Sequence, residues 1–303
     1  MIDIIITSYK EPNATLRAVN SFLAQNIFSD FRITVVDPFP EVEEVIKNNI
    51  NDKRVRFFLD PGEGKSYALN LLFQEYASKD RNDLFILSDG DVYVSENSVS
   101  EILRVFQDLS VGCVTGRPVP LESRSDKYGY WANVLFDGIH KVRMRKHIEK
   151  KFFECSGYLF AIRKGVILDF PLEVSEDSII PYLFWKNNYN IGYAHKAEVY
   201  VKNPSSWKDW MKQKIRNVKG HENLNRIAPD MPRTKTFLNE IKEGAIFALF
   251  QPRRFREIYW TFQLYVARLE MYRRAFNELR KKRNYSDGWR GDGEILSAKP
   301  LDA

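Results

Sequence analysis

The feature that most constrains the fold is a regular alternation, over residues 1–120, between short apolar runs and segments whose apolar side chains recur at helical spacing. The apolar runs lie at 4–7, 33–36, 55–59, 84–87 and 111–115, and the helical faces at 16–23, 42–50 and 68–76. Strands that are apolar on both faces are typical of a sheet covered by helices on both sides. This alternation predicts an α/β domain with a mostly parallel, doubly wound sheet.

The rest of the chain follows a different pattern. Residues 121–151 are rich in aromatic and basic side chains and are expected to include a helix over the edge of the sheet, and 152–162 form an apolar stretch. Residues 205–221 predict another helix, and the chain beyond Pro232 is typical of an amphipathic helical extension. We therefore expect one domain over 1–230, a helical extension over 231–285 and a flexible tail over 286–303.

Polar side chains follow four successive strands of the predicted sheet. Thr7, Ser8, Tyr9 and Glu11 follow the first strand, Asp37 ends the second, the run G-E-G-K-S-Y-A-L-N at 62–70 follows the third, and Asp89-Gly90-Asp91 follows the fourth. Ligands of open α/β sheets bind at the carboxyl ends of the strands. Asp89 and Asp91 are suited to Mg²⁺ or Mn²⁺, which bind carboxylates together with phosphate oxygens; taken alone, these residues are also typical of a turn.

Two other nucleotide-binding motifs are excluded by their spacing. A P-loop needs a glycine five residues before Gly64, where this chain has Leu59. A dinucleotide fingerprint needs G-x-G-x-x-G after the first strand, where the chain has T-S-Y-K-E-P. The four histidines have no zinc-type spacing, so we expect them in core or surface positions.

In their order along residues 2–221, the motifs resemble those of the inverting GT-A glycosyltransferases of family 2. The matching segments are T-S-Y-K-E at 7–11, Asp37, Gly64-Lys65 with Ala68-Leu69-Asn70, Asp89 and Asp91, Cys155-Ser156-Gly157, Glu176-Asp177, and Lys212 to Arg216, which resembles the family's Q-x-x-R-W segment. Two positions depart from the pattern. Pro38-Phe39-Pro40 replaces the usual turn after Asp37, and Asn217 replaces a tryptophan, which puts processive synthesis in doubt.

The resemblance implies transfer of a sugar from a nucleoside diphosphate sugar, expected to be UDP-linked, to a hydroxyl or phosphate acceptor. Such an acceptor could be a lipid-linked glycan precursor, in the synthesis of a cell-surface polysaccharide or glycolipid. Residues 1–120 would bind the donor and 121–230 the acceptor. The implied donor residues are Thr7, Ser8, Tyr9, Glu11, Asp37, Lys65, Asp89 and Gly90.

The remaining site residues follow from the same resemblance. Asp91 would hold the metal together with Asp89. Gly157, Glu176, Gln213 and Arg216 would lie on the side of the acceptor and the diphosphate, and Asp177 would be the general base. A second interpretation of Glu176 and Asp177 is the acidic first turn of a helix that Ser175 caps. The basic run at 141–151 predicts a solvated helix face or an acceptor-phosphate site.

An apolar seam marks the C-terminal extension. It consists of Phe255, Ile258, Phe262, Tyr265, Leu269, Tyr272, Phe276 and Leu279, at alternating steps of three and four residues. Basic side chains are abundant over 253–283, which suits the surface of an anionic bilayer. The alternative is packing against the catalytic domain or a second subunit.

Composition bears on location and partners. The two cysteines form no disulfide framework and no run reaches the ~18 apolar residues of a spanning helix, so we expect a cytoplasmic protein, attached at most peripherally to the inner face of the cell membrane. The net charge of +6 favours anionic partners. A non-enzymatic anion-binding or nucleic-acid-binding protein is the alternative function, but the set of acidic motifs favours the enzyme without nucleic acid.

Overall fold

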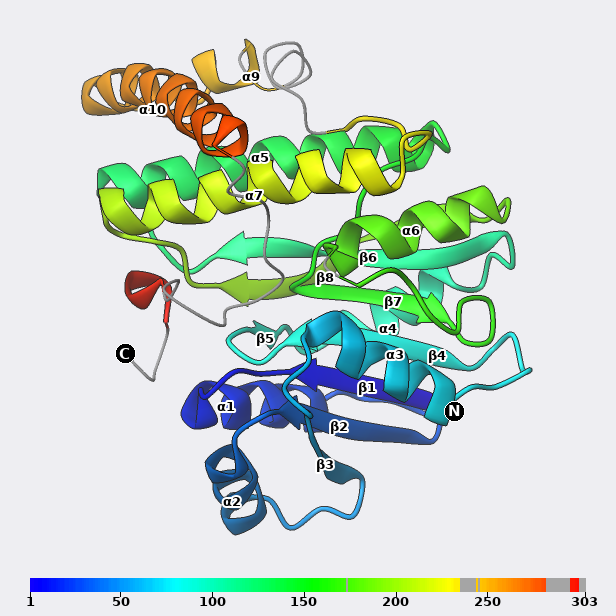
Figure 1. Ribbon diagram of the computed structural model, residues 1–303. Helices are drawn as coiled ribbons and strands as arrows, with labels where there is room; N and C mark the ends of the chain where they lie inside the picture. The colour runs from blue at the N-terminus through cyan, green and yellow to red at the C-terminus, as the bar shows by residue number, and fades with distance from the viewer. Residues whose placement is uncertain (173, 235–243, 245, 282–294, 300–303) are drawn as a thin grey trace.

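The computed structural model of the protein describes residues 1–172, 174–234, 244, 246–281 and 295–299 (Figure 1). Eight strands form one sheet in the order β3-β2-β1-β4-β7-β6-β8-β5. Their bounds are β1 Ile2–Thr7, β2 Phe31–Asp37, β3 Val55–Leu59, β4 Leu84–Asp89, β5 Tyr93–Val94, β6 Val111–Pro120, β7 Leu159–Arg163 and β8 Asn190–Val201. The first four strands in this order are parallel, β7 is antiparallel to both of its neighbours, and β8 is parallel to β6.

Helices cover both faces of the sheet, as the apolar strands predict. On one face lie α1 (Pro12–Leu23), α2 (Pro40–Asn49) and α4 (Ser98–Val105), and on the other α3 (Lys65–Glu75) and α6 (Glu176–Lys186). The isoleucines of β1 alternate between the two hydrophobic clusters: Ile4 and Ile6 pack with the first set of helices and Ile5 with the second. Proline at the first position of α1 and α2 favours helix initiation there.

A third layer of helices lies beyond the sheet (Figure 1). It contains α5 (Lys127–Ile148), α7 (Trp207–Ile227), α9 (Ile246–Leu249) and α10 (Phe255–Arg280), which share a hydrophobic cluster built around Trp131, Trp210 and Leu264. The carboxylate of Asp126 caps α5 by accepting hydrogen bonds from the amides of Tyr128 and Gly129. Because α5 also packs on β6 and β8, it connects this layer to the sheet.

The predicted seam of α10 does not form a single contact face. Within the described chain its buried residues are Glu257, Thr261, Leu264, Ala267, Met271, Tyr272 and Ala275, whereas Phe255, Ile258, Phe262, Leu269 and Phe276 of the seam are exposed. Small residues allow α10 to approach α5 and α7 closely, so the buried stripe is offset from the line of large apolar side chains. Packing within the chain therefore covers Tyr272 of the seam but not these exposed members, and packing on a second subunit stays a prediction.

Part of the C-terminal segment is packed rather than loose. The short 3₁₀ helix η2 (Leu296–Ala298) lies near the start of α7, where the amide of Ser297 donates to Oδ2 of Asp209 at 3.1 Å. The Lys299 ammonium lies 3.6 Å from a carboxylate oxygen of Glu11. The rest of the expected tail lies outside the described residues. None of the described helices has the length and apolar character needed to cross a bilayer.

Candidate functional site

The polar strand ends meet at one edge of the sheet, as the sequence predicts. Thr7 at the end of β1 is in register with Val36 and Asp89, and Asp37 is in register with Leu59. The segments that follow β1 and β4 approach each other closely at Gly90, whose amide donates to the carbonyl of Thr7 at 2.7 Å. A β-carbon at Gly90 would lie only 2.8 Å from Cβ of Ser8, so a larger residue would force the strand ends apart.

A partly buried ion-pair network connects the strand ends to the expected acceptor-side half. Lys65, the first residue of α3, places Nζ 2.6 Å from Oδ1 of Asp89 and 2.5 Å from Oε1 of Glu176. Burial opposes the charge of Lys65, but the two carboxylates outweigh it and raise the pKa of the ammonium. Burial raises the pKa of Glu176 to about 7 against the opposing effect of Lys65. The lysine thus holds together two acids that are far apart in the sequence.

Asp91 has the properties expected of a cation ligand. Its Oδ1 is buried and has no hydrogen-bond partner among the described residues. Burial, then the charges of Asp89 and Glu11, raise the pKa of Asp91 to about 8. No group of three or more histidine, cysteine or acidic side chains forms a ready-made metal site in the described part of the chain. The carboxylates of Asp89 and Asp91 nevertheless fit a hard divalent cation that also binds phosphate oxygens.

Asp177 lies in the first turn of α6 with both carboxylate oxygens oriented. Oδ2 accepts a hydrogen bond from the amide of Gly157 at 3.1 Å, and Oδ1 accepts one from the hydroxyl of Ser175 at 2.5 Å. The expected acidic first turn is confirmed. Ser175 occupies the N-cap position, but its hydroxyl accepts no capping bond from the helix backbone and donates to Asp177.

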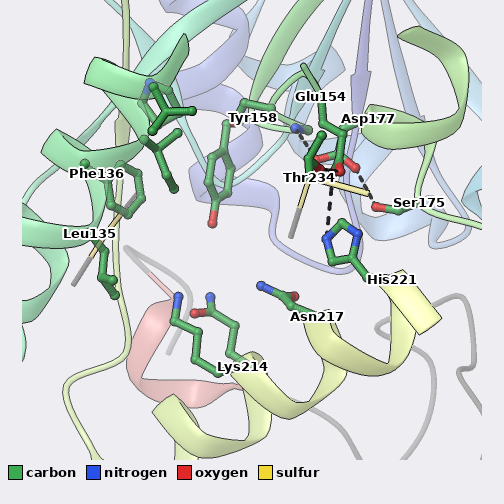
Figure 2. A pocket seen from close by; sticks show the side chains of 18 of the residues that line it. Leu135, Phe136, Glu154, Tyr158, Ser175, Asp177, Lys214, Asn217, His221 and Thr234 are labelled. Carbon is green, nitrogen blue, oxygen red and sulfur yellow. Dashed lines mark hydrogen bonds and ion pairs between the residues drawn. The ribbon is translucent and has the colours of Figure 1, made fainter. Parts of the chain in front are cut away.

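These groups face one cavity of about 740 Å³. Of the predicted site residues, the cavity lining contains Lys65, Asp89, Asp91, Gly157, Glu176, Asp177, Gln213 and Arg216. Gln213 and Arg216 reach it from α7, and Oε1 of Gln213 is buried without a hydrogen-bond partner among the described residues. Figure 2 shows Asp177 and Tyr158 facing this space together with residues of α7.

The other predicted donor residues lie at the same sheet edge but outside the cavity lining: Thr7, Ser8, Tyr9, Glu11, Asp37 and Gly90. The carboxylate of Asp37 accepts hydrogen bonds from the amides of Lys10 at 3.0 Å and Phe39 at 2.8 Å. It therefore fixes the turn in which the sequence departs from the family pattern. The ring of Tyr9 packs edge to face on Phe39.

Sequence reasoning missed several residues of the cavity. Tyr158 follows Gly157 directly, and burial followed by the charges of Asp91 and Asp89 raises the pKa of its hydroxyl. Glu154 is buried, accepts a hydrogen bond from Ser178 at 2.7 Å and lies 3.7 Å from Nε2 of His221. An acid within an apolar run was the available signal for Glu154. Cys155, which the sequence analysis did name, also lines the cavity, and its Sγ lies 3.2 Å from that of the buried free thiol Cys113.

The basic run at 141–151 is not uniformly a solvated face. Lys141, Arg145 and Lys150 are exposed, but Arg143 is buried and lines the cavity. Nη2 of Arg143 donates to the carbonyl of Cys155 at 2.6 Å. The interpretation as a solvated face is therefore wrong for this residue.

Comparisons with known proteins bear on the fold and the family of the chain. A solved structure with the same fold is the mannosyltransferase PcManGT from Pyrobaculum calidifontis in complex with GDP-Man and Mn²⁺, with a TM-score of 0.55, 14% sequence identity, and coverage of 92% of this chain and 80% of that one. No curated protein gives a significant sequence match. The sequence model of the family described as "Glycosyltransferase like family 2" matches residues 2–220. The chain therefore belongs to this glycosyltransferase family and has the GT-A fold.

Proposed function

We propose that the protein is a metal-dependent, inverting glycosyltransferase that moves a sugar from a nucleoside diphosphate sugar to a lipid-linked acceptor at a membrane surface. One observation carries the proposal. Asp91, whose Oδ1 is buried and has no hydrogen-bond partner among the described residues, faces the same cavity as the oriented carboxylate of Asp177. This combination provides a place for a cation with a diphosphate and, across the cavity, a base for the acceptor.

On the donor side, Thr7, Ser8, Tyr9, Glu11 and Asp37 would surround the nucleoside, and UDP is the nucleotide we propose. Asp91 would hold Mg²⁺ or Mn²⁺, with Asp89 and Gly90 beside the donor phosphates. When bound, the cation stabilises negative charge on the departing diphosphate. Arg216 on α7 is suited to the same charge because a guanidinium fork matches phosphate oxygens.

Lys65 would act by holding the site together. Its ammonium bonds Asp89 on the donor side and Glu176 on the acceptor side, which keeps two acids in one place despite their mutual repulsion. Glu176 would thus contribute to the position of α6 and of Asp177 next to it. Lys65 also places positive charge near the proposed diphosphate.

On the acceptor side, Asp177 would take the proton of the attacking hydroxyl. The hydrogen bonds from Gly157 and Ser175 fix the orientation of its carboxylate and leave further lone pairs for the acceptor. The hydroxyl oxygen would attack the anomeric carbon from the face opposite the diphosphate, so that the product has inverted configuration. A positioned base of this kind contributes about 10²–10⁴-fold to the rate.

The membrane part of the proposal rests on an exposed apolar face, which we call the docking face. It consists of Ile246, Leu249 and Phe250 around α9 and of Phe255, Ile258, Tyr259 and Phe262 on α10. Arg253, Arg254 and Arg256 are exposed beside it, whereas Glu257 is buried in an ion pair with Arg124. Large apolar rings next to exposed arginines complement an anionic phospholipid surface.

A screen of nucleotide sugars tests the enzymatic proposal. UDP-sugars and GDP-sugars are added to the full chain with Mn²⁺ or with EDTA, and thermal unfolding and donor hydrolysis are followed. A donor at 100 times its Kd stabilises the folded protein by about 2.7 kcal/mol. We expect this stabilisation in the presence of Mn²⁺ but not EDTA, and for only one of the two nucleotide classes. If no nucleoside diphosphate sugar stabilises the protein or is hydrolysed, the proposal is wrong.

A further inference from the structure

The cavity extends beyond the acids into the helical layer, where apolar side chains line it together with basic ones such as Lys214 and Arg268. Leu135, Phe136 and Ile139 of α5 line it together with Phe247 of α9 and Leu264 and Leu269 of α10. Figure 2 shows Leu135 and Phe136 across the pocket from Asn217 and His221 of α7. One part of this cavity thus suits a charged donor and its acceptor hydroxyl, and the other suits hydrocarbon.

The apolar part leads from the interior to the surface. Leu264 is buried, whereas Ile139 is 44% exposed and Leu269 is 55% exposed although both line the same cavity. Leu269 follows Phe262 by seven residues, two turns further along α10. The outer end of the cavity therefore lies on the same helix as the docking face.

Arg143 places a buried positive charge on the wall of this cavity. Its side chain lines the cavity and the residue is only 7% exposed. Nη2 is held by the carbonyl of Cys155, but Nη1 is buried and has no hydrogen-bond partner among the described residues. No carboxylate of the described chain forms an ion pair with it at 4.0 Å or less. A buried guanidinium with an unpaired N–H group is costly unless an anion binds it.

Arg143 is also connected to the proposed base. The amide of Cys155, whose carbonyl accepts from Arg143, donates to the carbonyl of Asp177 at 2.9 Å. A hydroxyl at Asp177, an anion at Arg143 and a hydrocarbon chain along α5 and α10 would therefore occupy consecutive parts of one cavity.

We propose that the acceptor is a three-part amphiphile: a hydroxyl that reacts at Asp177, a phosphate that binds Arg143, and a hydrocarbon chain that lies between α5 and α10 and reaches the docking face. This inference rests on the proposed function, and it adds a binding site for the acceptor that the donor chemistry does not require. In this proposal the hydrocarbon chain of the acceptor enters the cavity from the bilayer, so the acceptor lipid does not have to leave the membrane fully.

Calorimetry with n-alkyl phosphates of six, eight and ten carbons tests the site on the full chain, below the concentrations at which they form micelles. Each buried methylene contributes about 0.8 kcal/mol, so we expect affinity to rise about fourfold per carbon until the channel is full. Inorganic phosphate carries only the anionic group and n-octanol only the alkyl chain, so both should bind far more weakly than octyl phosphate. Equal affinity for the three alkyl phosphates would show that the cavity does not bind the hydrocarbon chain.

Two variants separate the anion site from the hydrocarbon site. Arg143→Gln should weaken decyl phosphate binding about tenfold or more while leaving n-octanol binding unchanged, because only the charged contact is lost. Arg145→Gln, an exposed position on the same helix, is the matched control and should bind decyl phosphate as the wild type does. Equal binding by Arg143→Gln and the wild type would refute the anion site.

The second variant, Ile139→Trp, fills the outer end of the channel at a half-exposed position. It should reduce the gain in affinity between six and ten carbons and leave Arg143 in place. It keeps the proposal testable if Arg143→Gln does not fold. Phe28→Ser, which changes an exposed ring outside the docking face, is the control and should leave the chain-length series unchanged. An unchanged series in Ile139→Trp would place the alkyl chain outside the cavity.

Binding of a nucleotide sugar with Mn²⁺ is measured in parallel. Donor binding without any preference among alkyl phosphates would overturn the acceptor site and leave the proposed function intact. Absence of donor binding would count against the proposed function itself, whatever the alkyl phosphates do.

Discussion

Replacing two phenylalanines of the docking face should release the protein from anionic membranes without unfolding it. Phe255 is 93% exposed and Phe262 is 64% exposed, and they lie two turns apart on α10. Since neither ring is part of the core, Phe255→Ser with Phe262→Ser should change the stability of the fold little. The rings should matter only when the bilayer covers them.

The magnitude follows from the exposed fractions. Full burial of a phenylalanine side chain is worth about 1.5–3 kcal/mol, so the exposed parts of the two rings together can contribute about 2.5–4.5 kcal/mol on entering the interface. A free-energy difference of about 1.4 kcal/mol changes the binding constant tenfold. The double variant should therefore bind vesicles about a hundredfold more weakly, or worse.

Flotation on vesicles with and without anionic phospholipid measures this effect. Phe28→Ser is the matched control, because Phe28 is 95% exposed but lies in the loop after α1, outside the docking face. Binding of the wild type should rise with anionic lipid and fall with salt, since each arginine near the surface adds about 1 kcal/mol. If the double variant floats as well as the wild type and Phe28→Ser, the docking face does not bind membranes.

Three further predictions concern the site and the helical layer. Asp177→Asn should lower sugar transfer by about 10²–10⁴-fold while Mn²⁺-dependent nucleotide binding persists, and near wild-type transfer would assign the base elsewhere, with Glu176 the next candidate. Asp91→Asn should make UDP affinity insensitive to Mn²⁺ and EDTA in calorimetry; an unchanged response to the metal would contradict its role as a ligand. Glu257→Gln should lower the free energy of unfolding in urea by about 1.5–3 kcal/mol, because the carboxylate accepts from Arg124 and from the amide of Arg253, and an unchanged midpoint would refute this. Burial raises the pKa of Glu257, but these hydrogen bonds outweigh burial and hold the pKa below its ordinary value of 4.5. The stability that the carboxylate contributes to the wild type should therefore be lost as the pH falls below 4.5, whereas the stability of Glu257→Gln should not change for this reason.

The part of the fold that sequence could predict is the part with local patterns. Apolar runs identified β1, β2, β4 and β6, because burial on both faces leaves few polar side chains within such strands. The run of β3 was apolar as well, although none of its residues is buried at the edge of the sheet. Strand β8 was missed because polar residues such as His195, Lys196 and Glu198 interrupt its pattern. The antiparallel direction of β7 could not be predicted either, since periodicity within a strand carries no information about the direction of its neighbours.

The site divides in the same way. Asp89 and Asp91 could be placed from the strand that precedes them, but the ion pair between Lys65 and Glu176 joins residues from distant elements and depends on how α3 and α6 pack. Arg143 was grouped with its basic neighbours because sequence does not reveal which side of α5 is covered. On α10, large apolar side chains suggested the buried stripe, yet Ala267 and Ala275 occupy it because close helix packing favours small residues there.

The insertion of β7 between β4 and β6 sets the order in which the chain can complete its sheet during synthesis. When β6 has emerged, β7 is still about 40 residues away, which at 5–20 residues per second is a delay of roughly 2–8 s. During this interval β4 has one unpaired edge and β6 has two, and unpaired strand edges are a known cause of aggregation. A fragment that ends at residue 120 should therefore be insoluble, and the smallest piece that can close the sheet must continue through β8.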